Sequence, residues 1–483
     1  MREEISKLNP QTVWQHFLKI TEIPRQSKNE EKILQYLISF AQQHKLDYEQ
    51  DKTGNLVIRK PAAGSDSKRM VVLQSHVDMV CEKNEDVDFN FDTDPIEPYF
   101  EDGWVKAKGT TLGADDGIGM ATQLALLEAD DITHPALECL FTVDEETGLT
   151  GAFGLDTDLL KGDILLNLDS EDDGQLFIGC AGGVDTRVEL PFEKENTPAN
   201  HQPYRLKVYG LRGGHSGDDI HKGFGNANKV LTRLLWEASD NFSLRFSSFD
   251  AGSAHNAIAR EGNALVMIPE EKKADFEKYI QDMEKTIQTE LHVTEPNVKL
   301  SLEKAEKPDF VVEKNSQFKL LNALHACPHG VMAWSQDIED FVETSTNLAV
   351  VKTKEDHFFI LNSHRSSVES AKENTKNQVA ATFRLAGARI EHGDGYPGWS
   401  PNPNSEIVKL TEQSYEDLFR EKPEVLAIHA GLECGLIGEK YPGMDMISIG
   451  PEITGAHSPD EAIEVKSVEK FWDLTLDVLK RVK

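Results

Sequence analysis

The sequence predicts an α/β fold with two domains, in which a discontinuous mixed α/β domain is interrupted by an inserted α+β domain. Apolar strand-like segments alternate with amphipathic helix-like segments as far as about residue 184, a pattern typical of mixed α/β layers. The pattern changes over residues 185–393, and segments of the first kind return over residues 394–483. With 483 residues, 39% of them hydrophobic, the chain is long enough to form two buried cores.

The composition argues against several classes of protein. The sequence carries 51 basic and 83 acidic side chains, and its formal net charge of −32 disfavours nucleic acid and anionic membranes as partners. No segment approaches the roughly 20 apolar residues of a membrane span, and residues 1–5 lack the apolar core of a signal peptide. Five cysteines without a C-x-x-C pair fit a reducing cytosol better than a disulfide scaffold. We therefore expect a soluble cytoplasmic protein.

The first domain is expected to begin with two helices between residues 10 and 51, followed by a short strand at residues 55–59. Three longer apolar segments are typical of buried strands, and they lie at residues 70–78, 136–143 and 163–169. The apolar spacing of residues 120–128 predicts a helix between the first two of these strands.

Each of these three strands ends in side chains that can bind a metal or move a proton. The first strand ends in His76 and Asp78, the second runs into the sequence DEETG at 144–148, and the third ends in Asp169. A glycine-flanked GADDG turn at 113–117 precedes the predicted helix. Because open α/β sheets place ligand sites at the carboxyl ends of their strands, we expect these groups to meet.

The inserted domain is expected to contain strands and helices in two comparable sets. The first set has strands at 205–210, 244–249, 264–268 and 298–302, and helices at 226–237 and 272–290. The second set has a helix at 316–326, strands at 347–352 and 357–362, and a helix at 370–385. The returning segments of the first domain then include 424–429 and 444–450.

Five motifs resemble, in order, the signature of the two-zinc aminoacylase/carboxypeptidase family of metallohydrolases. They are His-x-Asp at 76–78, GADDG at 113–117, DEETG at 144–148, Asp169, and GAHSP at 455–459. Within that family the chain is similar to the bacterial aminoacyl-histidine dipeptidases, and the resemblance runs from the first helix to the last. It implies that residues 1–184 and 394–483 form a catalytic di-metal domain, and that 185–393 form a lid that also builds a homodimer.

The resemblance also implies a ligand set for two divalent ions per chain. His76 and Asp169 would bind one ion, Glu146 and His457 the other, and Asp115 would bridge both while leaving a shared position for water. Imidazole and carboxylate together suit zinc, with cobalt or manganese as alternatives.

Two further acidic residues are expected to act beside the metals. Glu145 precedes a ligand, so it can serve as general base without binding an ion. Asp78 would hydrogen-bond His76 and fix its tautomer. Glu145 could instead lie behind the ligands or at the surface, and Asp116 is interpreted either as a loop residue or as one that lies behind the ligands.

Three residues of the inserted domain match family positions that bind substrate. By resemblance, His215 of the GGHSG loop reaches the partner subunit's active site, and Asn256 hydrogen-bonds the reaction intermediate. Arg365 would bind the substrate carboxylate, for which a planar guanidinium is suited. Each could instead be an ordinary turn residue or surface charge. His429 is not expected to be a ligand, and a role for Glu433 near the substrate's free amine stays open.

These observations lead to the hypothesis of a cytosolic two-metal dipeptidase that hydrolyses Xaa-His dipeptides, of which carnosine is an example, and related short peptides. A deacylase or carboxypeptidase of the same fold, acting on N-acyl amino acids, is one alternative. A non-enzymatic metal-binding interaction protein is the other, and the presence of Glu145 beside a complete ligand set argues against it.

Overall fold

The computed structural model describes residues 2–402 and 404–483, and the chain divides into two compact units. Unit 1 comprises Met1–Gly179, Pro401–Ala427 and Leu432–Lys483, and unit 2 comprises Cys180–Ser400 and Ile428–Gly431. The expected division, after residue 184 and after residue 393, differs by several residues at each side. The difference arises because β9 (Gly182–Pro191) pairs along its whole length with β18 (His357–Ser366), and residues 396–399 bridge back to 180–183.

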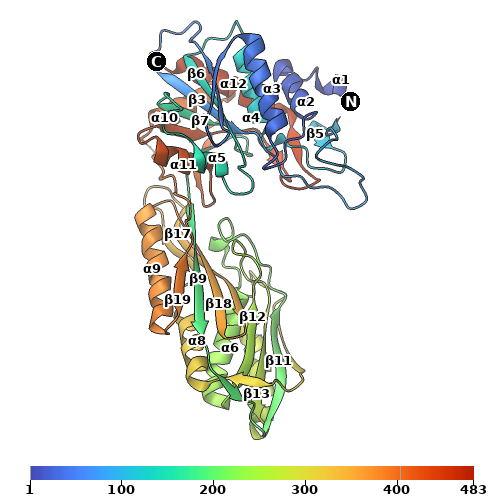
Figure 1. The fold of residues 1–483 in the computed structure, drawn as a ribbon, viewed down its shortest axis with the longest axis vertical. Coiled ribbons are helices and arrows are strands. Elements are labelled where there is room, and N and C mark those ends of the chain that lie inside the picture. The colour runs from blue at the N-terminus through green and yellow to red at the C-terminus, as the bar shows by residue number, and fades with distance from the viewer. Residues whose placement is uncertain (1, 403) are drawn as a thin grey trace. The chain divides into compact units, whose positions relative to one another are not determined.

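Unit 1 is built on an eight-stranded mixed sheet with the order β1-β2-β6-β3-β7-β21-β8-β20. Its strands β6, β3 and β7 are labelled in Figure 1. Its centre is parallel: β3 (Met70–His76) pairs with β6 (Ala136–Thr142) and β7 (Ile164–Asn167), and β7 pairs with β21 (Asp445–Ser448). The other strands are β1 (Asp47–Gln50), β2 (Leu56–Lys60), β8 (Gln175–Cys180) and β20 (Glu424–Ile428). The predicted α/β class is confirmed, and the three predicted buried strands are neighbours whose carboxyl ends meet at one edge.

The helices of unit 1 pack on this sheet and on one another. Helix α4 (Ala114–Glu128) contacts β3 and also α2 (Gln11–Ile20), whose side chains Val13, Trp14 and Phe17 are buried. Near the end of the chain, α10 (Glu406–Phe419) packs on β21 and on α12 (Val465–Arg481). The remaining helices are α1 (Arg2–Ile5), α3 (Glu31–His44), α5 (Thr150–Gly154) and α11 (Glu433–Lys440).

A small second sheet in unit 1 joins two distant parts of the chain. Its order is β22-β23-β5-β4, and all its pairs are antiparallel. The strands are β4 (Pro98–Glu101), β5 (Trp104–Ala107), β22 (Ile453–Thr454) and β23 (Ala462–Glu464). Because β5 precedes the 113–117 turn and β22 and β23 flank His457, this sheet brings those two segments together.

Unit 2 contains a nine-stranded sheet whose order is β14-β11-β13-β12-β17-β18-β9-β19, with β16 also paired to β17. Its further strands are β11 (His201–Tyr209), β12 (Arg245–Ala251), β13 (Gly262–Pro269), β14 (Lys299–Lys304), β16 (Gly330–Trp334), β17 (Val342–Thr353) and β19 (Arg389–His392). Strands β10 (Lys194–Asn196) and β15 (Phe310–Val312) form a separate pair. Two one-turn helices, η1 (Ile220–Lys222) and η2 (Glu270–Lys272), lie in its connections.

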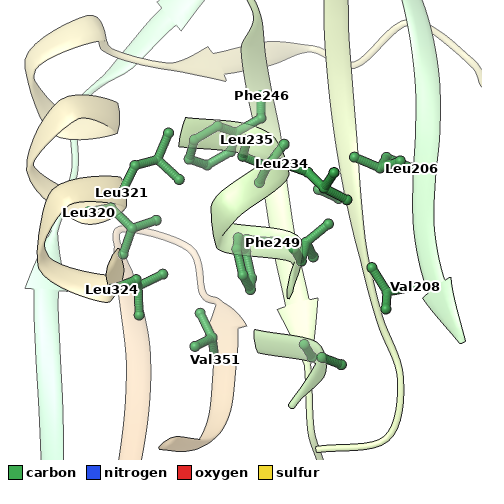
Figure 2. Packing of buried hydrophobic residues seen from close by; sticks show 14 of the residues in the cluster. Leu206, Val208, Leu234, Leu235, Phe246, Phe249, Leu320, Leu321, Leu324 and Val351 are labelled. Atoms are coloured by element: carbon green, nitrogen blue, oxygen red, sulfur yellow. The ribbon is translucent and has the colours of Figure 1, made fainter. Parts of the chain in front are cut away.

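Four longer helices pack on the strands of unit 2 and bury its core. They are α6 (Ala227–Phe242), α7 (Lys273–Glu290), α8 (Lys314–Ala326) and α9 (Glu369–Leu385). Figure 2 shows leucines of α6 and α8 directed at Phe246 and Phe249 of β12 and at Leu206 and Val208 of β11. Alternation along β11 places Leu206 and Val208 in this core and leaves Lys207, which lies between them, half-buried. Among the described residues of the whole chain, no helix combines the length and apolar character that a membrane span requires.

Unit 2 also contains a buried histidine whose two ring nitrogens each lie beside a threonine hydroxyl. The His364 side chain is fully buried, with Nε2 2.8 Å from Thr186 Oγ1 and Nδ1 2.9 Å from Thr346 Oγ1. Burial lowers the pKa of His364 to about 3, since an imidazolium would have to be desolvated there. In the unfolded chain the imidazole has a pKa near its ordinary value of about 6.5.

We therefore predict that unit 2 loses stability as pH falls through and below about 6.5. In this range His364 becomes protonated in the unfolded chain but stays neutral in the folded state, so protonation favours unfolding. Linkage puts the loss from this one residue at about 2 kcal/mol by pH 5. Denaturant unfolding of wild type and His364→Asn between pH 7 and pH 5 tests this, with exposed His325→Asn as the matched control. His364→Asn should show the shallower pH dependence; an unchanged slope would contradict the prediction.

Candidate metal centre and substrate-binding residues

The carboxylate of Asp115 lies between two imidazoles in unit 1. Its Oδ1 is 2.9 Å from His76 Nε2, and its Oδ2 is 3.2 Å from His457 Nε2. His76 is the last residue of β3, Asp115 lies in the first turn of α4, and His457 follows β22. Asp115 itself has a non-helical ψ of 116°, and its peptide bond to Asp116 is cis. Each oxygen therefore faces a different segment of the chain.

Two groups of candidate ligands share Asp115. The first group adds Asp169, whose Oδ1 is 3.2 Å from His76 Nε2. The second adds Glu146, whose Oε2 is 3.0 Å from His457 Nε2. Within each group the candidate ligand atoms all lie within 4.8 Å of one another. The structure thus brings together all five residues that were predicted as ligands, in the two sets that were predicted.

The donor set fits two divalent first-row ions. Each group offers one imidazole nitrogen and two carboxylates, the ligand types that zinc, cobalt and manganese accept. Glu146 supplies a second indication, because its Oε1 is buried and has no hydrogen-bond partner among the described residues. A buried carboxylate oxygen without a partner is costly, and a bound cation would satisfy it.

The electrostatics of the centre are dominated by burial and by these ion pairs. Burial disfavours the charged form of Asp115, but hydrogen bonds from His457 and His76 outweigh it and hold the pKa of Asp115 below its usual range. The same contacts to Asp115 and Glu146 raise the pKa of His457 to about 11. Burial raises the pKa of Asp169 to about 6.

Asp78 lies beneath the centre and joins two of its segments. Its Oδ1 is 3.4 Å from His76 Nδ1, as expected for a residue that orients the imidazole. It also accepts hydrogen bonds from the backbone N–H groups of Glu145 (3.0 Å) and Glu146 (3.2 Å) and from Ser27 Oγ (2.7 Å). Despite its burial, the charge of His76 and these donors lower the pKa of Asp78 to about 2. Asp78 therefore holds the 144–148 loop by two backbone hydrogen bonds, and its contact with His76 is a longer ion pair, since His76 Nδ1 has no hydrogen-bond partner among the described residues.

Glu145 lies beside the ligands in a largely buried position. One of its carboxylate oxygens falls within 4.8 Å of ligand atoms of His76 and Glu146. Burial raises the pKa of Glu145 well above its ordinary value; His76 opposes the shift, and the nearby Asp169 and Glu433 add to it. A carboxylate beside the candidate ligands that is not itself counted among them is positioned to accept a proton there.

Asp116 and Glu433 each accept hydrogen bonds through one carboxylate oxygen, and the other oxygen of each is buried without a partner among the described residues. Asp116 Oδ1 accepts the backbone N–H of Gly119 at 3.0 Å, so this carboxylate caps the helical part of α4. The Glu433 side chain is fully buried, and its Oε2 accepts from Gln74 Nε2 (2.6 Å) and Thr142 Oγ1 (2.7 Å). Gln74 in turn accepts from Asn167 Nδ2 at 2.6 Å, which makes a polar row across three strands.

This row was missed from the sequence, although a signal existed. Gln74 and Asn167 each stand two residues before a predicted ligand, His76 and Asp169, and therefore share its face of the sheet. Polar residues in otherwise apolar strands need partners when they are buried. His429, which was not expected to be a ligand, lies in unit 2, where its Nε2 is 2.7 Å from Ser345 Oγ.

The three predicted substrate-binding residues belong to unit 2. His215 Nε2 lies 3.3 Å from Arg365 Nη2, and its Nδ1 lies 2.8 Å from Asp218 Oδ2. Arg365 Nη1 donates to the hydroxyl of Tyr396 at 3.1 Å, a neighbour that the sequence did not indicate. Asn256 and His215 line one cleft of about 830 Å³. Segments 150 residues apart thus place His215 and Arg365 of one chain side by side.

Comparisons with known proteins agree with this geometry. Residues 72–481 match the model of peptidase family M20/M25/M40. The chain is 42% identical over 480 residues to the cytosol non-specific dipeptidase of Escherichia coli, covering 99% of each protein. Its structure is similar to that of the aminoacylhistidine dipeptidase from Vibrio alginolyticus, with a TM-score of 0.94 and 44% identity over 99% of this chain and 98% of that one.

A more distant structure shares the fold alone. A tripeptidase from Staphylococcus aureus superposes with a TM-score of 0.57 at 18% identity, over 98% of this chain and 99% of that one. The family match spans most of the chain and includes every residue of the two ligand groups. The chain therefore belongs to peptidase family M20/M25/M40 and is a metallopeptidase.

Proposed function

We propose that the protein is a two-metal dipeptidase that cleaves Xaa-His dipeptides and related short peptides. The observation that carries the proposal is Asp115, whose two oxygens face two separate imidazole–carboxylate groups. A carboxylate shared in this way would let one residue serve as ligand to both ions. The names of the Escherichia coli and Vibrio relatives support the substrate class, and the former also supports a cytoplasmic location.

His76, Asp169 and Asp115 would hold one ion, and Glu146, His457 and Asp115 the other. When bound, zinc, cobalt or manganese ions polarise a scissile carbonyl and make water more acidic. Glu145 then acts as general base: its carboxylate takes a proton from the attacking water and delivers it to the departing amine. Asp78 holds the backbone N–H groups of Glu145 and Glu146, so the base and its neighbouring ligand keep a fixed spacing.

Unit 2 supplies the groups that recognise the rest of the substrate. Arg365 would bind the peptide's terminal carboxylate, and the Tyr396 hydroxyl fixes one end of its guanidinium. Its Nε is buried without a hydrogen-bond partner among the described residues, which leaves a donor for a ligand. His215 and Asn256 would donate to the negative charge that develops on the carbonyl oxygen.

A substrate panel tests the proposal against a deacylase of the same fold. Metal-stripped protein is refilled with single metals and assayed on Xaa-His dipeptides, other dipeptides and their N-acetylated forms. A dipeptidase should cleave the free dipeptides and lose most activity when the amine is acetylated. Preference for the N-acetylated compounds would instead favour the deacylase.

Removal of the shared carboxylate should weaken both ions. We predict that Asp115→Ala reduces metal content from two ions per chain to less than one at equal free metal, because each group loses an oxygen ligand. Elemental analysis after equilibrium dialysis measures this, and the exposed Asp460→Ala serves as control. Wild type that holds only one ion when fully loaded would overturn the two-metal assignment.

Removal of the base should separate chemistry from metal binding. We predict that Glu145→Ala retains two ions but lowers kcat by about 10² to 10⁴, the range for loss of a positioned acid–base group. Steady-state kinetics combined with metal analysis of the same sample tests it. If kcat stays near wild type with both ions present, another base must act.

The role of His215 across subunits is tested by mixing variants. We propose a homodimer in which the His215 and Arg365 side chains of one unit 2 act on one substrate in the partner's catalytic unit. We predict that His215→Ala loses most of kcat while keeping its metals, because a donor to developing charge acts mainly in the transition state. Under subunit exchange, a mixture with Glu145→Ala should recover activity, since one site then combines intact residues of both chains.

A second mixture checks the grouping of the unit 2 residues. His215→Ala mixed with Arg365→Ala should recover nothing, because each unit 2 then lacks one of two adjoining side chains. Recovery in this second mixture would mean that the two residues serve different sites. Confirmed subunit exchange without recovery in the first mixture would show that His215 acts within its own chain.

A further inference from the structure

Glu461 is a buried carboxylate whose hydrogen bonds all go to one backbone loop. It is 2% exposed, and it accepts from the N–H groups of Leu112 (2.7 Å), Gly113 (3.0 Å), Ala114 (2.7 Å) and Asp115 (3.4 Å). These donors precede or begin α4, where backbone N–H groups have no helical partner. Bonds from N–H groups to an ionised carboxylate are stronger than neutral ones. Since Glu461 stands four residues after His457, it ties the His457 segment to the Asp115 segment.

Arg25 is a buried cation that joins the same loop to a third segment. It is 2% exposed, and its Nη1 donates to the carbonyls of Val77 (3.1 Å) and Asp78, while Nη2 donates to the carbonyl of Gly113. The guanidinium therefore bridges the segment after His76 to the segment before Asp115. Its bonds go to carbonyl oxygens, and none of the ion pairs among the described residues includes it.

The charge of Glu461 favours the charged form of the buried Arg25 across the loop. Burial lowers the pKa of Arg25, and the charge of Glu461 is the largest influence that opposes this shift. An isolated buried cation is strongly unfavourable, so a buried anion on the other side of the loop stabilises it. The pair neutralises itself without adding net charge beside the ligands.

The glycines of the loop make room for Arg25. A Cβ at Gly113 would lie 2.5 Å from Arg25 Nη2, and one at Gly117 would lie 2.9 Å from the same atom. Gly113 also has a φ of +69°, a conformation that side chains other than glycine rarely adopt. The glycines on both sides of Asp115 are thus explained by the guanidinium packed against them.

We propose that Arg25 and Glu461 are paired positioning residues that hold the His76, Asp115 and His457 segments in register. Neither is a candidate ligand. Each acts through the 112–115 backbone, and together they let the two oxygens of Asp115 face His76 and His457 at once. Their effect is on metal binding, so it can be measured without any assumption about the peptide substrate, although the site itself is that of the proposed function.

The test compares Glu461→Gln and Arg25→Lys with wild type by chelator competition on metal-stripped protein. Glu461→Gln keeps the shape of the side chain but removes its charge and replaces one oxygen by an NH2 group. That group would face backbone N–H donors and cannot accept their hydrogen bonds. Arg25→Lys keeps the charge but loses the fork that reaches two segments. Each should weaken the affinity for the metal by about 10- to 100-fold, the usual effect of changing a partner behind a ligand. Exposed Asp460→Asn and Arg420→Lys are matched controls that should leave affinity unchanged.

Two measurements separate positioning from general destabilisation. Each metal-free variant should melt at a lower temperature than wild type but remain folded at the assay temperature, and raising the metal concentration should restore activity. The double variant should lose no more metal affinity than the single variant that is more strongly affected, because both residues act through one loop. Wild-type affinity in either variant, additive losses in the double variant, or loss of the metal-free fold in both variants would overturn the proposal. If both variants lose metal affinity as expected but the wild-type protein cleaves no dipeptide, the result would count only against the proposed function.

Discussion

The structure of unit 1 depends on one carboxylate that must face two imidazoles at once. Asp115 meets this requirement because two imidazoles come within 3.2 Å of it. One is His76, at the end of β3, and the other is His457, in a loop 342 residues after Asp115. The small sheet of β4, β5, β22 and β23 provides the long-range pairing that makes this possible. The parallel arrangement of β6, β3 and β7 delivers the remaining ligands to the same edge.

This concentration of carboxylates carries an electrostatic cost that the surroundings reduce in two ways. Asp78 and Glu461 accept bonds from backbone N–H groups, which are fixed dipoles and therefore stabilise an anion without competing for the metal. Asp115, Asp169 and Glu146 are instead left for the imidazoles and for bound cations. Asp78 and Glu461 thus differ from Glu146, whose Oε1 is buried without a hydrogen-bond partner among the described residues, as are one oxygen each of Asp116 and Glu433.

The α/β class could be predicted from local patterns, whereas the grouping of the predicted ligands came from the resemblance to a known family. The apolar strand β3 ends in His76, and Asp169 follows two residues after β7, so the position of each predicted ligand was visible beside its strand. Arg25, Glu461 and Tyr396 could not be predicted, because their importance lies in contacts with segments 31 to 349 residues away. The limits of unit 2 were displaced for the same reason, since β9 is defined by its pairing with β18.

The contrast between the two units extends to how each holds its functional groups. In unit 1 the ligands project from strand ends and loops, so their spacing depends on buried charges such as Arg25 and Glu461. In unit 2, Arg365 lies on β18, which is paired on both sides by β17 and β9, and Tyr396 is held by a bridge to Gly183. Under the proposed function, a guanidinium on a strand paired on both sides and bonded to Tyr396 would need little ordering before it binds a carboxylate, and this would lower the entropic cost of binding. The proposed ligands would then depend on loops for their spacing, whereas the proposed carboxylate-binding group would depend on a continuous sheet.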